Sequence, residues 1–125
     1  MMANNKICVK KGDIFYVYLG TEKNGHVQCG GSNGMRPCII VNNRAACIYS
    51  PVLLVVPITS SEFKRQKHLP THLELHGILP KKSVAMFEQI FTVNRDQLSD
   101  KIGNIPDEMI SKVNQKLEIS FGLCA

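Results

Sequence analysis

The chain of 125 residues is 44% hydrophobic, which is enough to bury one core, and it contains no repeat or linker, so it predicts a single domain, residues 1–125. Lys and Arg outnumber Asp and Glu by 15 to 10, and the net charge of +5 favours polyanions or acidic protein segments as partners. The longest apolar run, residues 51–58, is too short to span a bilayer, and the N-terminus lacks the apolar segment of a signal peptide. We therefore expect a cytoplasmic protein with no membrane contact.

The first third of the chain predicts a strand, a loop and a second strand. Residues 14–19 are rich in aromatic and β-branched side chains and follow a Gly-Asp turn, which is typical of a strand. Residues 20–34 contain 5 glycines and few side chains to bury, so they predict a long, mobile loop. In the second strand, residues 36–43, Pro37 biases Arg36 toward extended geometry, so Arg36 begins the strand and faces the loop.

A third strand, residues 51–61, follows a connection that can hold a turn of helix. Its continuous apolar run predicts burial on both faces of a sheet. Pro57 predicts an edge or a bulge toward the polar end of this strand, because proline has no N–H to donate to a neighbouring strand. At that end Thr59, Ser60 and Ser61 place a group of hydroxyls.

The C-terminal half predicts a basic loop at residues 62–68, strands at 70–77 and 82–93, and a turn with one short strand at 95–105. Residues 105–122 are the one clear helix, with acidic residues in the first turn and a glycine as its stop. Five or six short strands and one terminal helix predict a mainly β fold, a small antiparallel barrel with a C-terminal α-helix packed on it. The apolar face expected for the helix consists of Met109, Ile110, Val113, Leu117 and Phe121.

Histidine spacing raises the question of a metal site. His68, His72 and His76 are four residues apart, as metal ligands on a helix can be, but Pro70 and the period-2 alternation of this segment argue against a helix. A strand would place His72, Glu74 and His76 on one face, and we expect that face to be solvated. The sequence therefore predicts no metal and no cofactor.

The 5 cysteines form no C-x-x-C pair and are odd in number, which fits reduced thiols better than a disulfide framework or a structural zinc site. None lies next to a histidine or at a helix N-terminus, where a thiol becomes a nucleophile. We expect Cys38 and Cys47 to fill the core. The glycine-rich stretch before Arg36 precedes a strand, whereas phosphate-binding glycine loops precede a helix.

Arg36 and Thr59 are the strongest candidates for chemistry from the residues alone. Each lies at the polar end of a strand, and the two strands are expected to be neighbours. A guanidinium group can hold two oxygens of a phosphodiester while a hydroxyl donates to a third. An arginine that ties down loop carbonyls is an equally good interpretation at this point.

Several motifs occur in a specific order: KKGDI, GMRPCII, ITS, LPTHLEL, SVAMFEQIFT, and then DKI followed by DEM. In these motifs the chain resembles the MazF/PemK/Kid family of toxin endoribonucleases over residues 10–123. The resemblance implies an SH3-like barrel of the CcdB/PemK-like type. It also implies a homodimer that cuts single-stranded RNA at a short sequence without a metal, that is neutralised by a cognate acidic antitoxin, and that binds DNA as a toxin–antitoxin complex.

Carried over by position, the resemblance makes Arg36 and Thr59 the catalytic residues. In such a reaction the RNA supplies its own nucleophile, the 2′-OH, so the protein stabilises charge on the phosphoryl oxygens and moves protons. Arg36 would stabilise that charge and Thr59 would orient the phosphate. The residues expected to contact RNA are Ser60, Ser61, Lys64, Arg65, Glu88, Gln89 and Phe91.

Two positions depart from the family pattern. Phe91 stands where many relatives carry arginine, so one phosphate contact is lost, is moved to Arg95, or is replaced by base stacking on the ring. The loop of residues 20–34 is longer than usual and has Gly31 and Ser32 where relatives often carry an acidic residue. Both departures concern sequence specificity more than the reaction.

Two alternatives stay open. One is a non-catalytic, gyrase-poisoning toxin on the same barrel, which would act through a C-terminal tryptophan, whereas this chain has no tryptophan. The other is a binding module that holds RNA in a salt-sensitive way without cutting it. For the antitoxin we expect an extended acidic, partly apolar segment that displaces the loop of residues 20–34.

Overall fold

The computed structural model describes residues 7–20, 33–60 and 69–123, and this part of the chain contains seven strands, two α-helices and three 3₁₀ helices. The helices are α1 (Arg44–Tyr49), α2 (Ile110–Ser120), η1 (Phe87–Gln89), η2 (Arg95–Gln97) and η3 (Asp107–Met109). The strands are β1 (Asp13–Tyr18), β2 (Met35–Ile40), β3 (Val52–Ser60), β4 (His72–Leu75), β5 (Ser83–Met86), β6 (Phe91–Asn94) and β7 (Leu98–Asn104).

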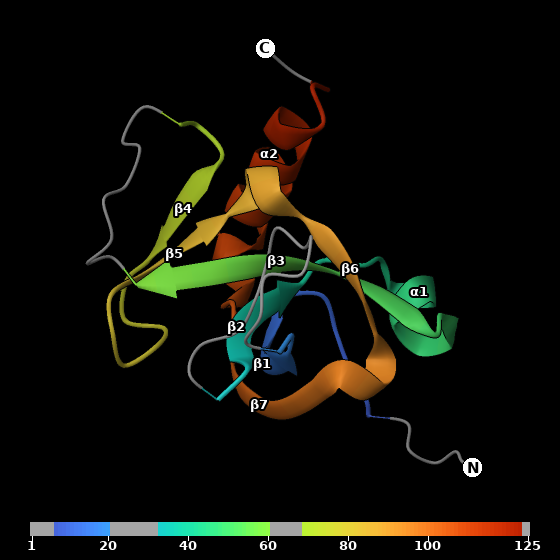
Figure 1. Ribbon diagram of the computed structural model, residues 1–125. Coiled ribbons are helices and arrows are strands. Elements are labelled where there is room, and N and C mark those ends of the chain that lie inside the picture. Colours follow the sequence, from blue (N-terminus) through green and yellow to red (C-terminus); the bar gives the residue numbers. More distant parts are fainter. Residues whose placement is uncertain (1–6, 21–32, 61–68, 124–125) are drawn as a thin grey trace.

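The strands form one antiparallel sheet in the order β4-β5-β3-β2-β1-β7, and β6 pairs with β3 outside this path. The long strand β3 is shared: its first half pairs with β6, its second half pairs with β5, and β2 lies along its other edge (Figure 1). Pro57 is buried where β3 changes partner from β6 to β5. The irregularity expected at Pro57 is therefore a change of partner inside the sheet, because a residue without an N–H fits a gap between two ladders.

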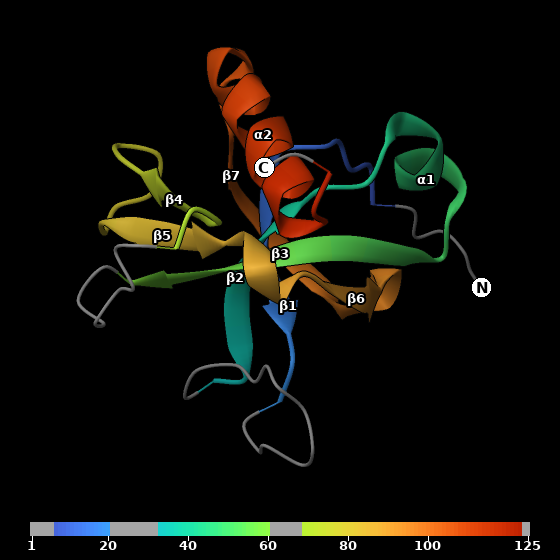
Figure 2. The same cartoon turned by 90° about the horizontal axis from the view of Figure 1, so that it is seen from above.

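The predicted mainly β, antiparallel fold with a C-terminal helix is confirmed, but closure into a barrel is not found. Within the described ranges β7 pairs only with β1, and β6 pairs only with β3. Figure 2 shows α2 standing over the middle of β3, with β4 and β5 toward one end of that strand and α1 at the other. None of the helices in the described part is long and apolar enough to cross a bilayer.

Two hydrophobic clusters cover the two faces of the sheet. Because side chains alternate along a strand, Val56 and Ile58 pack in the cluster beneath α2, whereas Leu53 and Val55 pack in the cluster on the opposite face. This confirms that the apolar run of the third strand is buried on both sides. Cys38 and Cys47 are buried in the second cluster, as expected.

The C-terminal half differs from its prediction in two places. The stretch of residues 82–93 is not one strand, because η1 interrupts it where the Phe87 N–H donates to the carbonyl of Thr71 at 3.0 Å. The helix α2 is shorter than predicted, since η3 precedes it, and Phe121 beyond its end is 60% exposed. The other residues of the expected apolar face do pack against the core, namely Met109, Ile110, Val113 and Leu117.

The connection between β2 and β3 does contain a helix, α1. The side chain of Asn43 caps it by accepting a hydrogen bond from the Ala46 N–H at 2.8 Å. The loop predicted at residues 20–34 lies mostly outside the described residues, as does the basic loop at 62–68.

Candidate active site

Register places Arg36 and Thr59 at the same end of the sheet. The ladder between β2 and β3 ends at the pair Cys38–Pro57, so Arg36 and Thr59, each two residues further on, occupy the next position of two antiparallel strands. Residues two apart on a strand share a face, and neighbouring strands lie about 5 Å apart. Both residues are half-buried. A guanidinium group and a hydroxyl at these positions can reach one phosphate group from adjacent strands.

The same row continues across the sheet to an acidic residue. Thr59 pairs with Val84 of β5, and Val84 pairs with Glu74 of β4. Because residues that pair across strands point to the same face, Thr59 and Glu74 lie on one side of the sheet with the buried Val84 between them. The site face therefore has a cationic side chain toward β2 and an acidic one toward β4.

Ser60 does not join this row. It pairs with Ser83 and follows Thr59 directly, so strand alternation turns its side chain to the face beneath α2. Ser60, which was expected to contact RNA, therefore lies on the opposite face of the sheet from Thr59 in this register. Ser61, Lys64 and Arg65, which were also expected to contact RNA, lie outside the described residues.

Glu88 lies at the centre of a hydrogen-bond network between η1 and β4. The hydroxyl of Thr71 donates to its Oε1 at 2.7 Å, and Nε2 of His72 lies 3.0 Å from its Oε2. The side-chain amide of Gln89 donates to the same Oε2 at 3.2 Å and to Sδ of Met86 at 3.5 Å. These contacts bring the two expected RNA-contacting residues, Glu88 and Gln89, together on one 3₁₀ turn.

Partial burial pushes the pKa of Glu88 upward, but the hydrogen bonds from Thr71 and His72 outweigh it and hold this pKa below its usual value. Glu88 is therefore a carboxylate at neutral pH. A carboxylate repels phosphate and accepts only from donors, so the amino and imino groups of nucleobases suit it better than the RNA backbone does.

We expect Glu88→Gln to lower the stability of the folded protein at pH 7 by less than about 1 kcal/mol, because the Glu88 side chain is still 31% exposed and water screens its charge. The pKa of Glu88 is lower in the folded state than in the unfolded state. The stabilisation that its carboxylate gives the fold is therefore complete above the unfolded-state pKa of about 4.3 and is lost as pH falls through the folded-state pKa. Urea unfolding at pH 7 and at about pH 3.5 should show that the difference in unfolding free energy between the wild type and Glu88→Gln is smaller at the lower pH. Glu118→Gln, the same change at an exposed position on α2, is the matched control; an undiminished difference for Glu88→Gln at low pH would contradict the network.

The histidines of the expected solvated face bind separate carboxylates. His72 contacts Glu88, and His76 contacts Glu74 at 2.8 Å between Nε2 and Oε1. His72 is mostly buried, and its Nδ1 has no hydrogen-bond partner within the described part of the chain. In residues 7–20, 33–60 and 69–123, no three His, Cys, Asp or Glu side chains gather where they could hold a metal ion.

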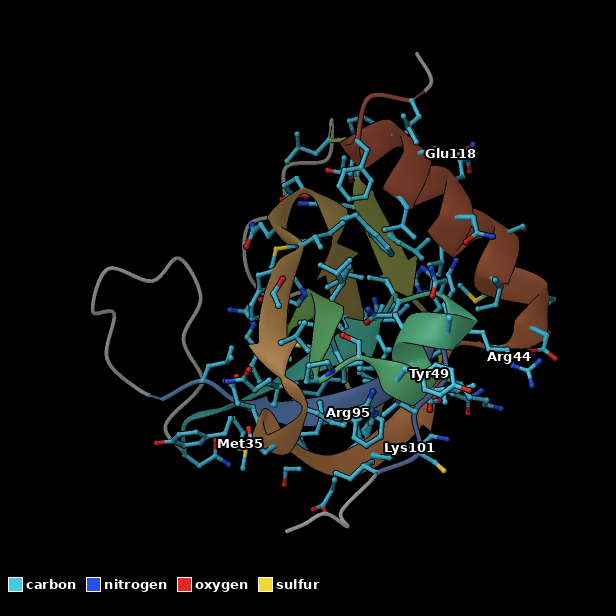
Figure 3. The ribbon with its side chains drawn as sticks, turned by 90° about the vertical axis from the view of Figure 1, so that its right-hand side faces the viewer. Met35, Arg44, Tyr49, Arg95, Lys101 and Glu118 are labelled. Carbon is cyan, nitrogen blue, oxygen red and sulfur yellow. The ribbon has the colours of Figure 1, made fainter. Side chains whose placement is uncertain are left out.

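Arg95 is not a substitute phosphate ligand for the arginine that Phe91 replaces. Its guanidinium group is used inside the fold, next to α1 (Figure 3), where it donates to backbone carbonyls at 2.7 to 3.4 Å. The suggestion that the contact moved to Arg95 is therefore wrong. Phe91 is half-buried, pairs with Val55 and packs against the second cluster, so part of its ring already serves the core. The carbonyls that Arg95 binds are those of Ile7, Ala46, Cys47 and Ser50.

A thiol beside Arg36 takes no part in this chemistry. Burial raises the pKa of Cys38 to about 12, although the nearby charge of Arg36 acts to lower it. Cys38 therefore stays protonated, in agreement with its expected role as a core residue.

The sequence did not reveal the Thr71–His72–Glu88 network. Glu88 is 17 residues from Thr71 and 16 from His72, and these side chains meet only through the pairing of β4 with β5.

Comparisons with known proteins identify the family of the chain. A family profile for the PemK-like, MazF-like toxin of type II toxin-antitoxin systems matches residues 10–121. The chain is 34% identical over 118 residues to endoribonuclease EndoA of Bacillus subtilis (strain 168), covering 92% of this chain and 96% of that protein. It is 32% identical over 118 residues to endoribonuclease MazF of Staphylococcus saprophyticus, covering 92% of each.

Solved structures share the fold at lower identity. A mycobacterial endoribonuclease in complex with its cognate antitoxin superimposes with a TM-score of 0.70 at 22% identity, covering 92% of this chain and 96% of that one. The MazE–MazF complex of Deinococcus radiodurans gives a TM-score of 0.69 at 20% identity, covering 94% and 99%. The chain belongs to the PemK-like, MazF-like toxin family of type II toxin–antitoxin systems.

Proposed function

We propose that this protein is a sequence-specific, metal-independent endoribonuclease toxin that cuts single-stranded RNA and is neutralised by a cognate antitoxin. The observation that carries the proposal is the antiparallel register of β2 and β3, which supports adjacent positions for Arg36 and Thr59 when it is continued by two residues beyond the pair Cys38–Pro57. The family of the chain and the endoribonuclease names of its relatives support the same reaction.

The reaction is a transphosphorylation within the RNA. The 2′ oxygen forms a bond to the adjacent phosphorus as its proton leaves to a base, and the bond from phosphorus to the 5′ oxygen breaks as that oxygen takes up a proton. The products are a fragment ending in a 2′,3′-cyclic phosphate, which water can open, and a fragment beginning with a 5′-hydroxyl. Negative charge grows on the phosphoryl oxygens, where donors fixed in advance are most effective.

Arg36 and Thr59 divide the work at that phosphate. The guanidinium of Arg36 offers parallel N–H groups to two phosphoryl oxygens, and the hydroxyl of Thr59 donates to one oxygen from the next strand. We assign Glu88 and Gln89 to the bases and not to the phosphate, because a carboxylate next to the phosphate would oppose binding.

We expect Thr59→Val to slow cleavage about 10- to 100-fold, because one hydrogen bond to a charged oxygen is lost while the shape is kept. Thr59→Ser, which restores a hydroxyl, should recover most of the rate. Single-turnover cleavage of a long unstructured RNA measures both variants under saturating protein. Equal rates for the valine variant and the wild type would remove Thr59 from the mechanism.

A homodimer is part of this proposal. Large apolar side chains are exposed together on α1 and the start of β3, which immediately follows it, and such a patch is typical of a protein interface. We expect light scattering to give the mass of two chains. The side chains of this patch are Ile48, Tyr49, Val52 and Leu54.

The antitoxin is expected to be an acidic, partly apolar segment. Two structural relatives are described as complexes with an antitoxin or with MazE, and the net charge of +5 favours an acidic partner for this chain. This antitoxin segment is also expected to displace the loop of residues 20–34, most of which lies outside the described residues.

A further inference from the structure

Tyr18 presents an aromatic ring at the end of β1 that no part of the mechanism uses. The residue is 53% exposed. Its ring lies where a side chain at Gly34 would be, since a Cβ built on Gly34 would come within 2.6 Å of Cε1 and 3.1 Å of Cδ1. Gly34 has a φ of +79°, which also favours glycine. The ring is therefore seated against the backbone on one side and open to solvent on the other.

The backbone around Tyr18 is held in place from two directions. Its carbonyl accepts a hydrogen bond from the side-chain amide of Gln97 at 2.9 Å. On the other side it pairs with Met35, and the N–H of Leu19 donates to the carbonyl of Gly34 at 2.8 Å. A ring on a fixed backbone loses little conformational freedom when a flat ligand stacks on it, so stacking there is favourable.

The position of Tyr18 relates it to the candidate active site. Val17, its neighbour in β1, pairs with Arg36, so the ring lies at the same hairpin end as the guanidinium. Strand alternation directs Tyr18 and Arg36 to opposite faces. A base on Tyr18 therefore belongs to a nucleotide beyond the two that flank the scissile phosphate, on an RNA strand that passes around this end of the hairpin.

We propose that Tyr18 is a stacking platform for one RNA base outside the two nucleotides that flank the scissile phosphate, an inference that rests on the proposed function. Every nucleobase offers a π face, and proteins of several folds stack single-stranded bases on aromatic side chains exposed on a sheet. The net charge of +5 and the adjacent Arg36 favour a polyanion at this end of the molecule. Figure 3 shows that Met35, the partner of Tyr18, lies far from Tyr49 in the apolar patch on α1.

The composition of the chain allows a direct optical test. It contains 3 tyrosines and no tryptophan, so tyrosine emission is not masked. One double variant, Tyr16→Phe with Tyr49→Phe, keeps only Tyr18, and a matched one, Tyr16→Phe with Tyr18→Phe, keeps only Tyr49. The probe is a single-stranded RNA with 2′-fluoro groups, which cannot be cut by 2′-OH attack. Binding should quench the emission of the first protein and leave that of the second unchanged.

Affinity gives a second measurement with the same probe. Tyr18→Leu should raise the Kd for 2′-fluoro RNA about 5- to 150-fold, the range expected for one stacked base, whereas Tyr18→Phe should stay within about twofold. Phe121→Leu, which removes an exposed ring beyond the end of α2, is the control and should bind as the wild type does. The loss of affinity caused by Tyr18→Leu should disappear when the probe is an abasic strand of the same length, because such a strand has no base to stack on the ring.

The outcomes separate this inference from the proposed function. If the RNA binds but the emission of the Tyr18-only protein is unchanged, the platform is refuted even when wild-type protein cuts ordinary RNA. If emission is quenched and Tyr18→Leu weakens binding, the platform stands, and a wild type that fails to cut ordinary RNA then counts against the endoribonuclease alone.

Discussion

Arg36→Ala is expected to cut RNA about 100- to 1000-fold more slowly than the wild type, the usual cost of removing one donor that meets charge formed in the transition state. The loss should fall mainly on kcat, because the phosphoryl oxygens gain charge as the bond to the 2′ oxygen forms. Arg36→Lys should recover only part of the rate, since an ammonium group keeps the charge without the planar pair of donors. Single-turnover rates with one RNA compare the three proteins.

The control for this experiment is Arg44→Ala. Arg44 begins α1, is exposed and lies far from Met35, the neighbour of Arg36 (Figure 3). Its removal therefore makes the same change in net charge without touching the phosphate. A comparable rate loss in both alanine variants would point to general electrostatic attraction of RNA. An unchanged rate for Arg36→Ala alone would remove this residue from the reaction.

Arg95→Met is expected to destabilise the folded protein by about 2 to 4 kcal/mol. The guanidinium group donates to four carbonyls, of which Ile7 belongs to the N-terminal segment and the others to the end of α1 and the residue after it. Methionine fills similar space but leaves these acceptors without a donor. Urea unfolding, with an unchanged dependence on denaturant, measures the difference, and Arg44→Met should change stability by less than about 0.5 kcal/mol.

The same variant distinguishes a structural arginine from an RNA ligand. At a temperature where Arg95→Met is folded, its cleavage rate and its Kd for 2′-fluoro RNA should match those of the wild type. A variant that keeps full stability but loses RNA binding would show that Arg95 contacts phosphate after all, against the hydrogen bonds of the fold.

Features that depend on local pattern were predictable from the sequence. The apolar run of β3 indicated burial on both faces, and the order of two successive strands indicated that β2 and β3 are neighbours, as their register shows. Pro106 and the acidic residues after it marked the region where the C-terminal helix begins.

Features that depend on contacts distant in the sequence were not. Residues 82–93 have the composition of one strand, but a hydrogen bond from Phe87 to Thr71 turns the chain at η1. Arg95 is a residue type that commonly binds phosphate at a surface, but the carbonyls that it binds in the fold are 45 or more residues away in the sequence. Phe121 continues the helical periodicity but lies beyond the last contact with the core. Such long-range contacts are set by topology, which no local periodicity contains.

The most direct test of the central claim is to incubate purified protein with a long unstructured RNA in EDTA and to map every new 5′ end by primer extension, with Arg36→Ala in parallel. The proposed mechanism predicts discrete ends that share one short motif, that carry a 5′-hydroxyl, and that are absent or greatly reduced for the variant. Intact RNA at high protein concentration, or identical ends for both proteins, would contradict a metal-independent cleavage that depends on Arg36.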